Sequence, residues 1–198
     1  LTFLPPYPLP FYLPLFMGGF MRKLFLLVVL AGMVGMVYGL NPDAFQISCT
    51  PSVNYSVQIS TPAAGLAFSA VAVGTTYVNS STATITNNGD VTADWKIKAT
   101  ALNTWTLGAT PAQNVARLLG ALKSTLAVTG DFDTALDLLT TGEENMNATK
   151  YTVDQTGGDV AKTTNRLLSI RLDSPTDTTV DVEQKFRVEV KAYPSGTF

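Results

Sequence analysis

Ser81-Thr-Ala-Thr-Ile-Thr-Asn-Asn-Gly-Asp-Val-Thr-Ala-Asp-Trp-Lys-Ile-Lys-Ala99 carries the strongest structural pattern in this sequence. On both sides of Asn88-Gly89, apolar and polar residues alternate with a period of two, which is typical of a β-strand with one buried face. Asn and Gly tolerate positive φ angles and so favour tight turns. The stretch therefore predicts a β-hairpin over residues 81–99, with Trp95 on its buried face.

The same alternation extends in both directions from this hairpin. In the last strand, Phe186, Val188, Val190 and Ala192 are expected to face inward, and the charged residues between them outward. Eight or so strands joined by short turns predict an all-β fold, a two-layer antiparallel sandwich of the immunoglobulin-like or jelly-roll-like kind. The other predicted strands are 45–49, 53–59, 66–70, 149–153 and 167–172, the last of which should pair with 185–192 to close the fold.

The middle of the chain is expected to contain one or two short helices. Residues 131–139 space Phe132, Leu136 and Leu139 at intervals of three and four, which favours a short helix. Residues 111–123 fit two structures. Thr110-Pro111-Ala-Gln113 resembles a capping box that opens a helix, but the residues that follow also alternate as in a strand. The strand is preferred there and the helix stays open; residues 143–147 are expected to be a polar loop.

The N-terminal region predicts a secretory signal peptide over residues 21–39. Arg22 and Lys23 follow Met21, an apolar run extends from Leu24 to Val37, and the run closes on small residues at Gly39. This run is too short for a comfortable membrane span. We therefore expect cleavage after Gly39, a mature domain over residues 40–198 and no stable membrane span after cleavage.

Residues 1–20 are rich in proline and carry no charge, so they predict neither a helix nor the charged start of a signal peptide. The codons of Gly18-Gly19 can spell a purine-rich ribosome-binding sequence ahead of Met21. The preferred interpretation is an over-extended bacterial reading frame that should begin at Met21. The alternative is a genuine proline-rich leader.

Composition narrows the classes of partner. The whole chain has a net charge of −2 at pH 7, which gives no indication of a nucleic-acid partner. Cys49 is the single cysteine, so no internal disulfide is expected in spite of the secretory route. Gln46 stands where a lipobox needs an aliphatic residue, so Cys49 is predicted to be an unpaired or buried thiol.

The segment Thr84-Ile-Thr-Asn-Asn-Gly-Asp-Val-Thr-Ala-Asp-Trp95 resembles a signature of bacterial secreted immunoglobulin-like modules, "TVTNxGdvtadw". The ending "VEQKFRVEVKA" (182–192) is similar to the closing strands of such modules. In layout, residues 66–192 resemble the fibre-forming and coat-associated proteins of the TasA and camelysin type. The resemblance implies a surface or matrix module with no catalytic residue to carry over. The sequence departs from the camelysin pattern because it contains no histidine.

The search for chemistry finds few candidates. Without histidine there is no His-dependent triad or ordinary zinc site, and we expect neither an enzyme nor a cofactor. Two groups of acidic residues are weak candidates for calcium, Asp131 with Asp133 and Asp173 with Asp177. The first group lacks the glycine and glutamate of a calcium loop, so acids at a helix N-terminus are the preferred explanation. The second group flanks a turn, where acidic residues are ordinarily solvated.

The two tryptophans offer a possible sugar-stacking surface. Trp95 shares a face with Val91 and Ile97, so core packing is favoured. Trp105, in a less regular segment, is the weak ligand-binding candidate, although core packing is favoured there as well. Tyr77 and Tyr151 are the other aromatic residues that an exposed row would need.

These observations predict a non-catalytic secreted structural protein of the cell surface, the extracellular matrix or a filament. The alternative is an extracellular module that binds carbohydrate or another ligand. The expected strands 45–49 and 53–59 contain no charged residue, whereas the strand 185–192 carries four. Because charges are a natural protection of strand edges, the N-terminal segment is the expected donor or template for strand addition between copies or with other surface proteins.

Overall fold

The computed structural model describes residues 48–62, 65–68 and 70–198. The chain divides after Thr50, and Pro51–Phe198 forms one compact unit. The expected frame extension 1–20, the signal peptide 21–39 and most of the expected strand 45–49 lie outside the described residues. Within the described part, residues 48–50 are irregular and exposed.

The compact unit is built almost entirely of β-strands, as predicted, and the described residues contain no α-helix. A single short 3-10 helix, η1 (Thr129–Asp131), stands in the middle of the chain. No helix of the described part is long and apolar enough to span a membrane. The strands are β1 (Val57–Ser60), β2 (Thr76–Val78), β3 (Ala83–Asn87), β4 (Ala93–Ala101), β5 (Thr106–Leu107), β6 (Val115–Leu122), β7 (Glu144–Asn145), β8 (Asn165–Asp173) and β9 (Phe186–Pro194).

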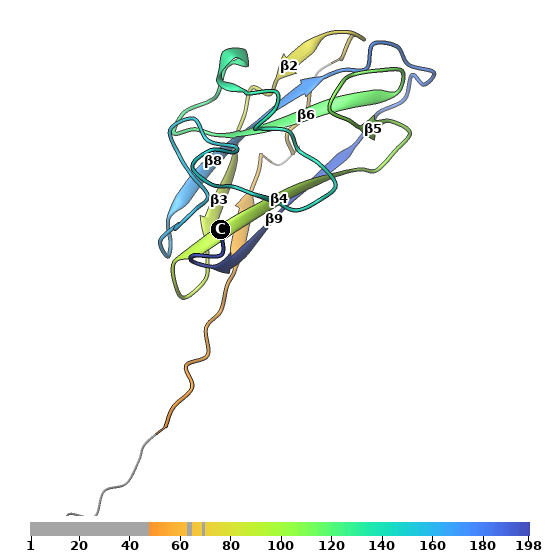
Figure 1. Cartoon of the computed structure of the whole chain (residues 1–198). Helices are drawn as coiled ribbons and strands as arrows, with labels where there is room; N and C mark the ends of the chain where they lie inside the picture. The colour runs from red at the N-terminus through yellow and green to blue at the C-terminus, as the bar shows by residue number, and fades with distance from the viewer. Residues whose placement is uncertain (1–47, 63–64, 69) are drawn as a thin grey trace, which may run out of the picture. The chain divides into compact units, whose positions relative to one another are not determined.

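The strands form two sheets (Figure 1). The larger has the order β1-β3-β8-β6-β5, and β2 continues the line of β3 along the same edge of β8. The smaller has the order β7-β4-β9, and β4 pairs with β9 over nine residues. All pairs are antiparallel except β5 with β6. Antiparallel sheets bury one face and wet the other, which explains the alternation along β4 and β9.

The predicted hairpin over residues 81–99 is wrong in its pairing. Both strands exist, but β3 belongs to the larger sheet and β4 to the smaller, so they face each other across the core. The expected closing pair is wrong for the same reason, because β8 and β9 lie in different sheets. Alternation shows which face of a strand is buried, and a strand can bury that face beside its neighbour or opposite it. Hence β3, β4, β8 and β9 were predictable as strands, and their partners were not.

The two sheets share one hydrophobic core. Ile85 from β3, Trp95 from β4 and Leu118 from β6 are each no more than 2% exposed. The inward residues of β9 pack against this core as predicted. A second, smaller cluster on the outer face of the larger sheet contains Leu119, Ala121, Ala127 and Phe132. Both faces of β6 are therefore buried, which explains why its sequence fitted two structures; the preferred strand is confirmed.

Four other local expectations are corrected. Beyond Asp131, the last residue of η1, the expected helix 131–139 is replaced by a single turn, because Phe132 enters the small cluster while Leu139 enters the main core. Residues 149–153 make one isolated bridge, Thr152 with Leu122, in place of a strand. The expected loop 143–147 contains the two-residue strand β7. Residues 66–68 are irregular, although Leu66 and Phe68 pack against the core.

One side of the fold is closed and the other is open. The long segment 123–164 donates and accepts backbone hydrogen bonds to β6 of one sheet and to β4 of the other, for example Leu139 N–H to Leu118 and Met146 N–H to Trp95. On the opposite side the edge strands are β1 and β9. Among the described residues, no backbone hydrogen bond joins these two strands.

Candidate functional site

The open side of the fold is the candidate site, and its first component is the outer edge of β1. Chain pairing extends beyond β1 toward the N-terminus, because Asn88 N–H donates to Ser56 and Asp90 N–H donates to Asn54, both at 3.0 Å. With Ser60 opposite Thr84 at the other end, residues 54–60 form one extended edge segment. We call residues 54–60 the edge segment.

The hydrogen-bond pattern shows which backbone groups of the edge segment are free. In an antiparallel pair, every second residue exchanges hydrogen bonds with its neighbour strand. The carbonyls of Asn54 and Ser56 accept hydrogen bonds from the N–H groups of Asp90 and Asn88. The backbone N–H and C=O groups of the even-numbered residues therefore point toward β3. The N–H and C=O groups of Tyr55, Val57 and Ile59 therefore point to the outer edge, where no described strand receives them.

The usual protections of an edge strand are missing here. No charged residue occurs between Asp43 and Asp90, so β1, β2, β3 and their connections are all uncharged. Two apolar side chains of the edge segment are more than a third exposed, Tyr55 at 38% and Ile59 at 39%. An exposed edge without charge, proline or bulge is a template for pairing with another chain.

The second component is a groove between the edge segment and β9. Tyr55, Ser56 and Val57 form one wall. Val190, Lys191, Ala192 and Tyr193 form the other, and the open groove between them has a volume of about 470 Å³. On this side the groove separates the edges of the two sheets, whereas on the opposite side the segment 123–164 bridges them. The groove thus offers room for inward-pointing side chains of a strand added to β1.

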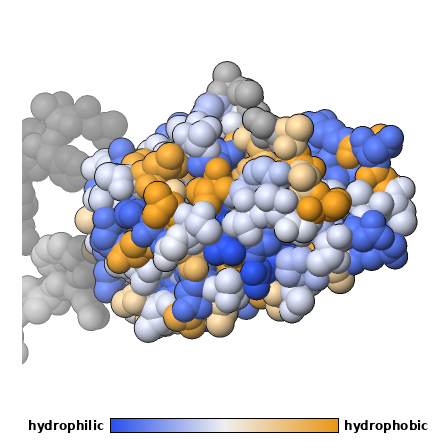
Figure 2. Space-filling model, turned by 90° about the horizontal axis from the view of Figure 1, so that it is seen from above, coloured by the Kyte–Doolittle hydropathy of each residue, from blue (hydrophilic) through white to orange (hydrophobic). Residues whose placement is uncertain are grey.

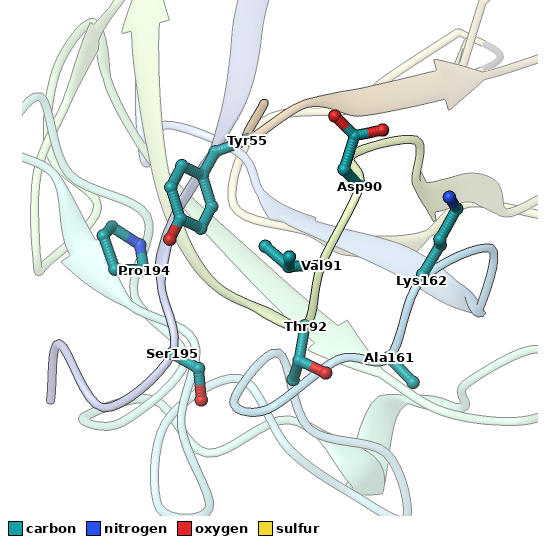
Figure 3. Close-up of a pocket in the computed structure, with 8 residues that line it drawn as sticks. All are labelled: Tyr55, Asp90, Val91, Thr92, Ala161, Lys162, Pro194 and Ser195. Carbon is teal, nitrogen blue, oxygen red and sulfur yellow. The ribbon is translucent and has the colours of Figure 1, made fainter. Parts of the chain in front are cut away.

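A larger hollow of about 710 Å³ continues from this groove at the end of the fold where β9 finishes. Figure 3 shows the Tyr55 ring beside Pro194 on one side and Asp90 and Lys162 on the other. Val91, Thr92, Ala161 and Ser195 complete its lining. Tyr55 lines both hollows, so the edge segment borders both of them on the open side.

The wet face of β9 contrasts with the edge segment. Lys191 pairs with Glu143, and Lys98 pairs with Glu189 at 3.0 Å. Hydrogen bonds from Lys191 and Tyr193 hold the pKa of the Glu143 carboxyl below its ordinary value. Charged residues at this density protect a sheet face against association. Figure 2 shows a different side, the molecule seen from above, where hydrophobic patches lie separately between polar ones.

The first pair of calcium candidates is occupied by local hydrogen bonds. Asp131 accepts from Lys123 Nζ at 2.7 Å, and this hydrogen bond is the main reason why the pKa of Asp131 lies below its ordinary value. Asp133 accepts from the N–H groups of Ala135 and Leu136, which likewise lower its pKa. Asp131 therefore holds the start of the segment 131–139 to Lys123, the residue after β6, whereas Asp133 stabilises a local turn.

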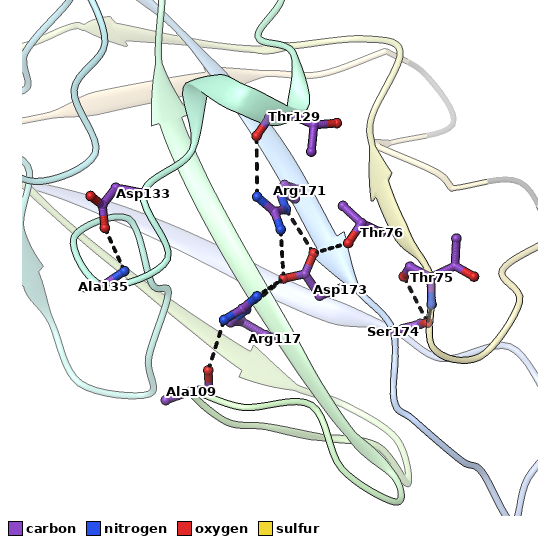
Figure 4. Close-up of polar contacts among 10 residues, drawn as sticks. All are labelled: Thr75, Thr76, Ala109, Arg117, Thr129, Asp133, Ala135, Arg171, Asp173 and Ser174. Atoms are coloured by element: carbon purple, nitrogen blue, oxygen red, sulfur yellow. Dashed lines mark hydrogen bonds and ion pairs between the residues drawn. The ribbon is translucent and has the colours of Figure 1, made fainter.

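Asp173, from the second pair, is 4% exposed and joins three strands (Figure 4). It accepts hydrogen bonds from Arg171 at 2.8 Å, from Arg117 at 2.7 Å and from Thr76 at 2.8 Å. Burial raises the pKa of Asp173, but the hydrogen bonds from Arg171, Thr76 and Arg117 outweigh it and leave the pKa below its ordinary value. This carboxylate fixes β2 and β6 to the two edges of β8.

Asp177 does not join Asp173. It is exposed and accepts from Gln113 Nε2 at 3.0 Å and from Thr178 N–H at 2.8 Å. Over the described residues, no three carboxylate or thiol side chains gather in a way that would hold a metal ion. Cys49 is exposed and unpaired in the described part of the N-terminal unit.

The aromatic candidates do not form a stacking surface. Trp95 is fully buried, and Trp105 is 8% exposed with its indole N–H donating to Thr178 at 3.0 Å. Tyr151 is 1% exposed and donates to the carbonyl of Leu138 at 2.6 Å. Tyr77 accepts from Ala72 N–H at 2.7 Å. Tyr55, which sequence reasoning did not single out for a site, has the most open ring of these aromatic residues at 38%.

Comparison with known proteins does not assign the chain to a family. No model of a known protein family matches the sequence, and no curated protein is significantly similar to it. The resemblance to proteins of the TasA and camelysin type therefore stays a prediction.

Proposed function

We propose that this chain is a non-catalytic structural subunit of the cell surface, the extracellular matrix or a filament, and that it assembles through the edge of β1. The proposal includes an immunoglobulin-like sandwich of the TasA and camelysin type and export through the signal peptide of residues 21–39. The observation that carries it is the edge segment, where no described strand receives the outward backbone groups of Tyr55, Val57 and Ile59 and no charge blocks their use.

The physical reason is the contrast between this edge and the rest of the fold. Exposed strand edges associate readily, so soluble monomers protect them with charged residues. The chain carries such protection on the face of β9, where Arg187, Glu189 and Lys191 lie. A chain that protects one region and leaves the neighbouring edge bare is suited to strand addition at that edge.

A pair of substitutions at one position tests the proposal. Ile59→Pro removes an N–H that points away from β3, so the fold should survive, but a second strand can no longer pair there. Ile59→Ala keeps the N–H and serves as the matched control. We expect sedimentation velocity and negative-stain microscopy of the full chain to show multimers for the wild type and Ile59→Ala, and monomers for Ile59→Pro. A wild-type chain that remains monomeric at high concentration contradicts the proposal.

A second candidate function is carbohydrate binding at the larger hollow, which is favoured by the open Tyr55 ring opposite Asp90 and Lys162. Carbohydrate sites combine an aromatic face with polar groups that bind hydroxyls. Retention of the chain by soluble polysaccharides in affinity electrophoresis tests this function. Loss of retention in Asp90→Ala/Lys162→Ala with unchanged assembly would support it, and no retention of the wild type would contradict it.

A further inference from the structure

We infer that two copies of the chain pair β1 with β1 in antiparallel fashion, centred on Val57, and that the resulting closed dimer is the unit of assembly. This inference rests on the proposed function, because it names the partner that the edge of β1 receives. The partner is a second copy of the same edge segment.

The backbone allows this pairing. Tyr55, Val57 and Ile59 present their N–H and C=O groups outward, and an antiparallel partner must present its own free groups at every second residue. A second edge segment does so. Several registers satisfy this requirement, but only the register centred on Val57 overlaps all the residues from 54 to 60 in both copies.

The side chains match in the same register. Val57 stands opposite Val57 of the second copy, and Tyr55 stands opposite its Ile59. Aromatic residues paired with β-branched residues are among the favourable cross-strand pairs. Because Val57 packs toward the core, Tyr55 and Ile59 lie on the same side of the strand, where the exposed parts of both would be covered by the partner.

No repulsion between like charges opposes this strand pairing. The edge segment contains no Asp, Glu, Lys or Arg, so two identical copies bring no like charges together at the strand pair. The alternative partner within a second copy is β9, whose wet face carries Arg187, Glu189 and Lys191. Pairing through identical surfaces closes after two copies, so any longer filament needs a further contact between dimers.

Like or opposite charges introduced at positions 55 and 59, which face each other in the dimer, test the register. In Tyr55→Lys/Ile59→Lys, each introduced lysine faces a lysine of the partner at two places in the dimer. In Tyr55→Lys/Ile59→Glu, each lysine faces a glutamate. Tyr55→Lys/Val73→Glu has the same net charge as the second variant without the opposing partner, and Val73 is similarly exposed at 46%. All positions are exposed enough to keep the fold, which circular dichroism verifies.

Sedimentation equilibrium then gives the dimer dissociation constant of each full-chain variant, in a Cys49→Ser background. We expect the Lys/Lys variant to dimerise roughly tenfold or more weakly than the Lys/Glu variant, with the Tyr55→Lys/Val73→Glu control also weaker than Lys/Glu. If the Lys/Lys and Lys/Glu variants lose assembly equally, the register or the partner is wrong, for example because residues 45–49 of a neighbour occupy the edge. If both assemble like the wild type, the edge is not the contact and the proposed function fails with it.

Discussion

Asn87 is the residue at which the chain leaves the larger sheet for the smaller one. It is fully buried, and its side-chain N–H₂ donates to the carbonyls of Val91 at 2.9 Å and Val160 at 2.7 Å. Its side-chain oxygen accepts from Gly89 N–H at 3.0 Å. Sequence patterns favoured a turn here because Asn and Gly tolerate positive φ, but neither Asn88 nor Gly89 has a positive φ. The turn depends instead on side-chain hydrogen bonds and on close packing, which a propensity cannot predict.

Substitutions of Trp95 test how the core is packed, again at the scale of a single residue. The ring is fully buried, so Trp95→Ala should lower the free energy of unfolding by about 3–5 kcal/mol. The indole N–H of Trp95 has no hydrogen-bond partner in the described part, so Trp95→Phe loses volume without losing a hydrogen bond and should cost clearly less. Urea unfolding at pH 7 measures both. An alanine variant that is as stable as the phenylalanine variant would contradict the burial.

The lowered pKa of Asp173 leads to a prediction for how the free energy of unfolding depends on pH. Its pKa is lower in the folded chain than its ordinary value, so it stabilises the fold at neutral pH and this contribution is lost as pH falls through the folded pKa. We expect the free energy of unfolding to decrease in acid, and Asp173→Asn to flatten that decrease while being less stable at pH 7. Urea unfolding at pH 7 and near pH 3 measures this, with Asp177→Asn at an exposed carboxylate as control. An equally steep decrease in both variants would contradict the role of Asp173.

At the scale of elements, the strands were predictable where alternation is clean and their connections were not. The faces of β4 and β9 followed from local periodicity, because a strand with one wet face has to alternate. The segment 131–139 misled, because residues spaced as on a helix enter two different hydrophobic clusters. The pairing of β1 with β3 was also hidden, because it depends on the order of strands in the folded sheet.

The crossing between β3 and β4 gives a prediction at this scale. A Cβ atom on Gly89 would lie 2.6 Å from the carbonyl oxygen of Asn54 and 3.1 Å from Ser56 N. Both are backbone atoms of the edge segment, so Gly89→Ala must displace it, at a cost of about 1–3 kcal/mol. Gly130→Ala is the matched control, because nothing lies within 4 Å of its Cβ. Thermal unfolding of the two variants should separate them, and equal midpoints would contradict the close approach.

At the scale of the whole molecule, the two sides of the fold differ in kind. The segment 123–164 joins the sheets on one side by backbone hydrogen bonds, whereas on the other side no backbone hydrogen bond among the described residues joins β1 and β9, and a groove lies between them. Sequence reasoning identified the absence of charge in the N-terminal strands, and their use in association stays a prediction. The sequence did not predict the hydrogen-bond partners of Asp173, a calcium candidate, or of Trp105, the sugar candidate. Both side chains bond to residues that lie far along the chain.

Amide hydrogen exchange, followed residue by residue by NMR at low and high protein concentration, tests the assembly at the edge of β1 most directly. The amides of Tyr55, Val57 and Ile59 point outward, so they should exchange fast in the dilute monomer and become protected roughly tenfold or more on assembly. The amide of Gln58 points toward β3 and should be protected at both concentrations. Multimers in which the Val57 amide still exchanges as fast as in the monomer would contradict strand addition at this edge.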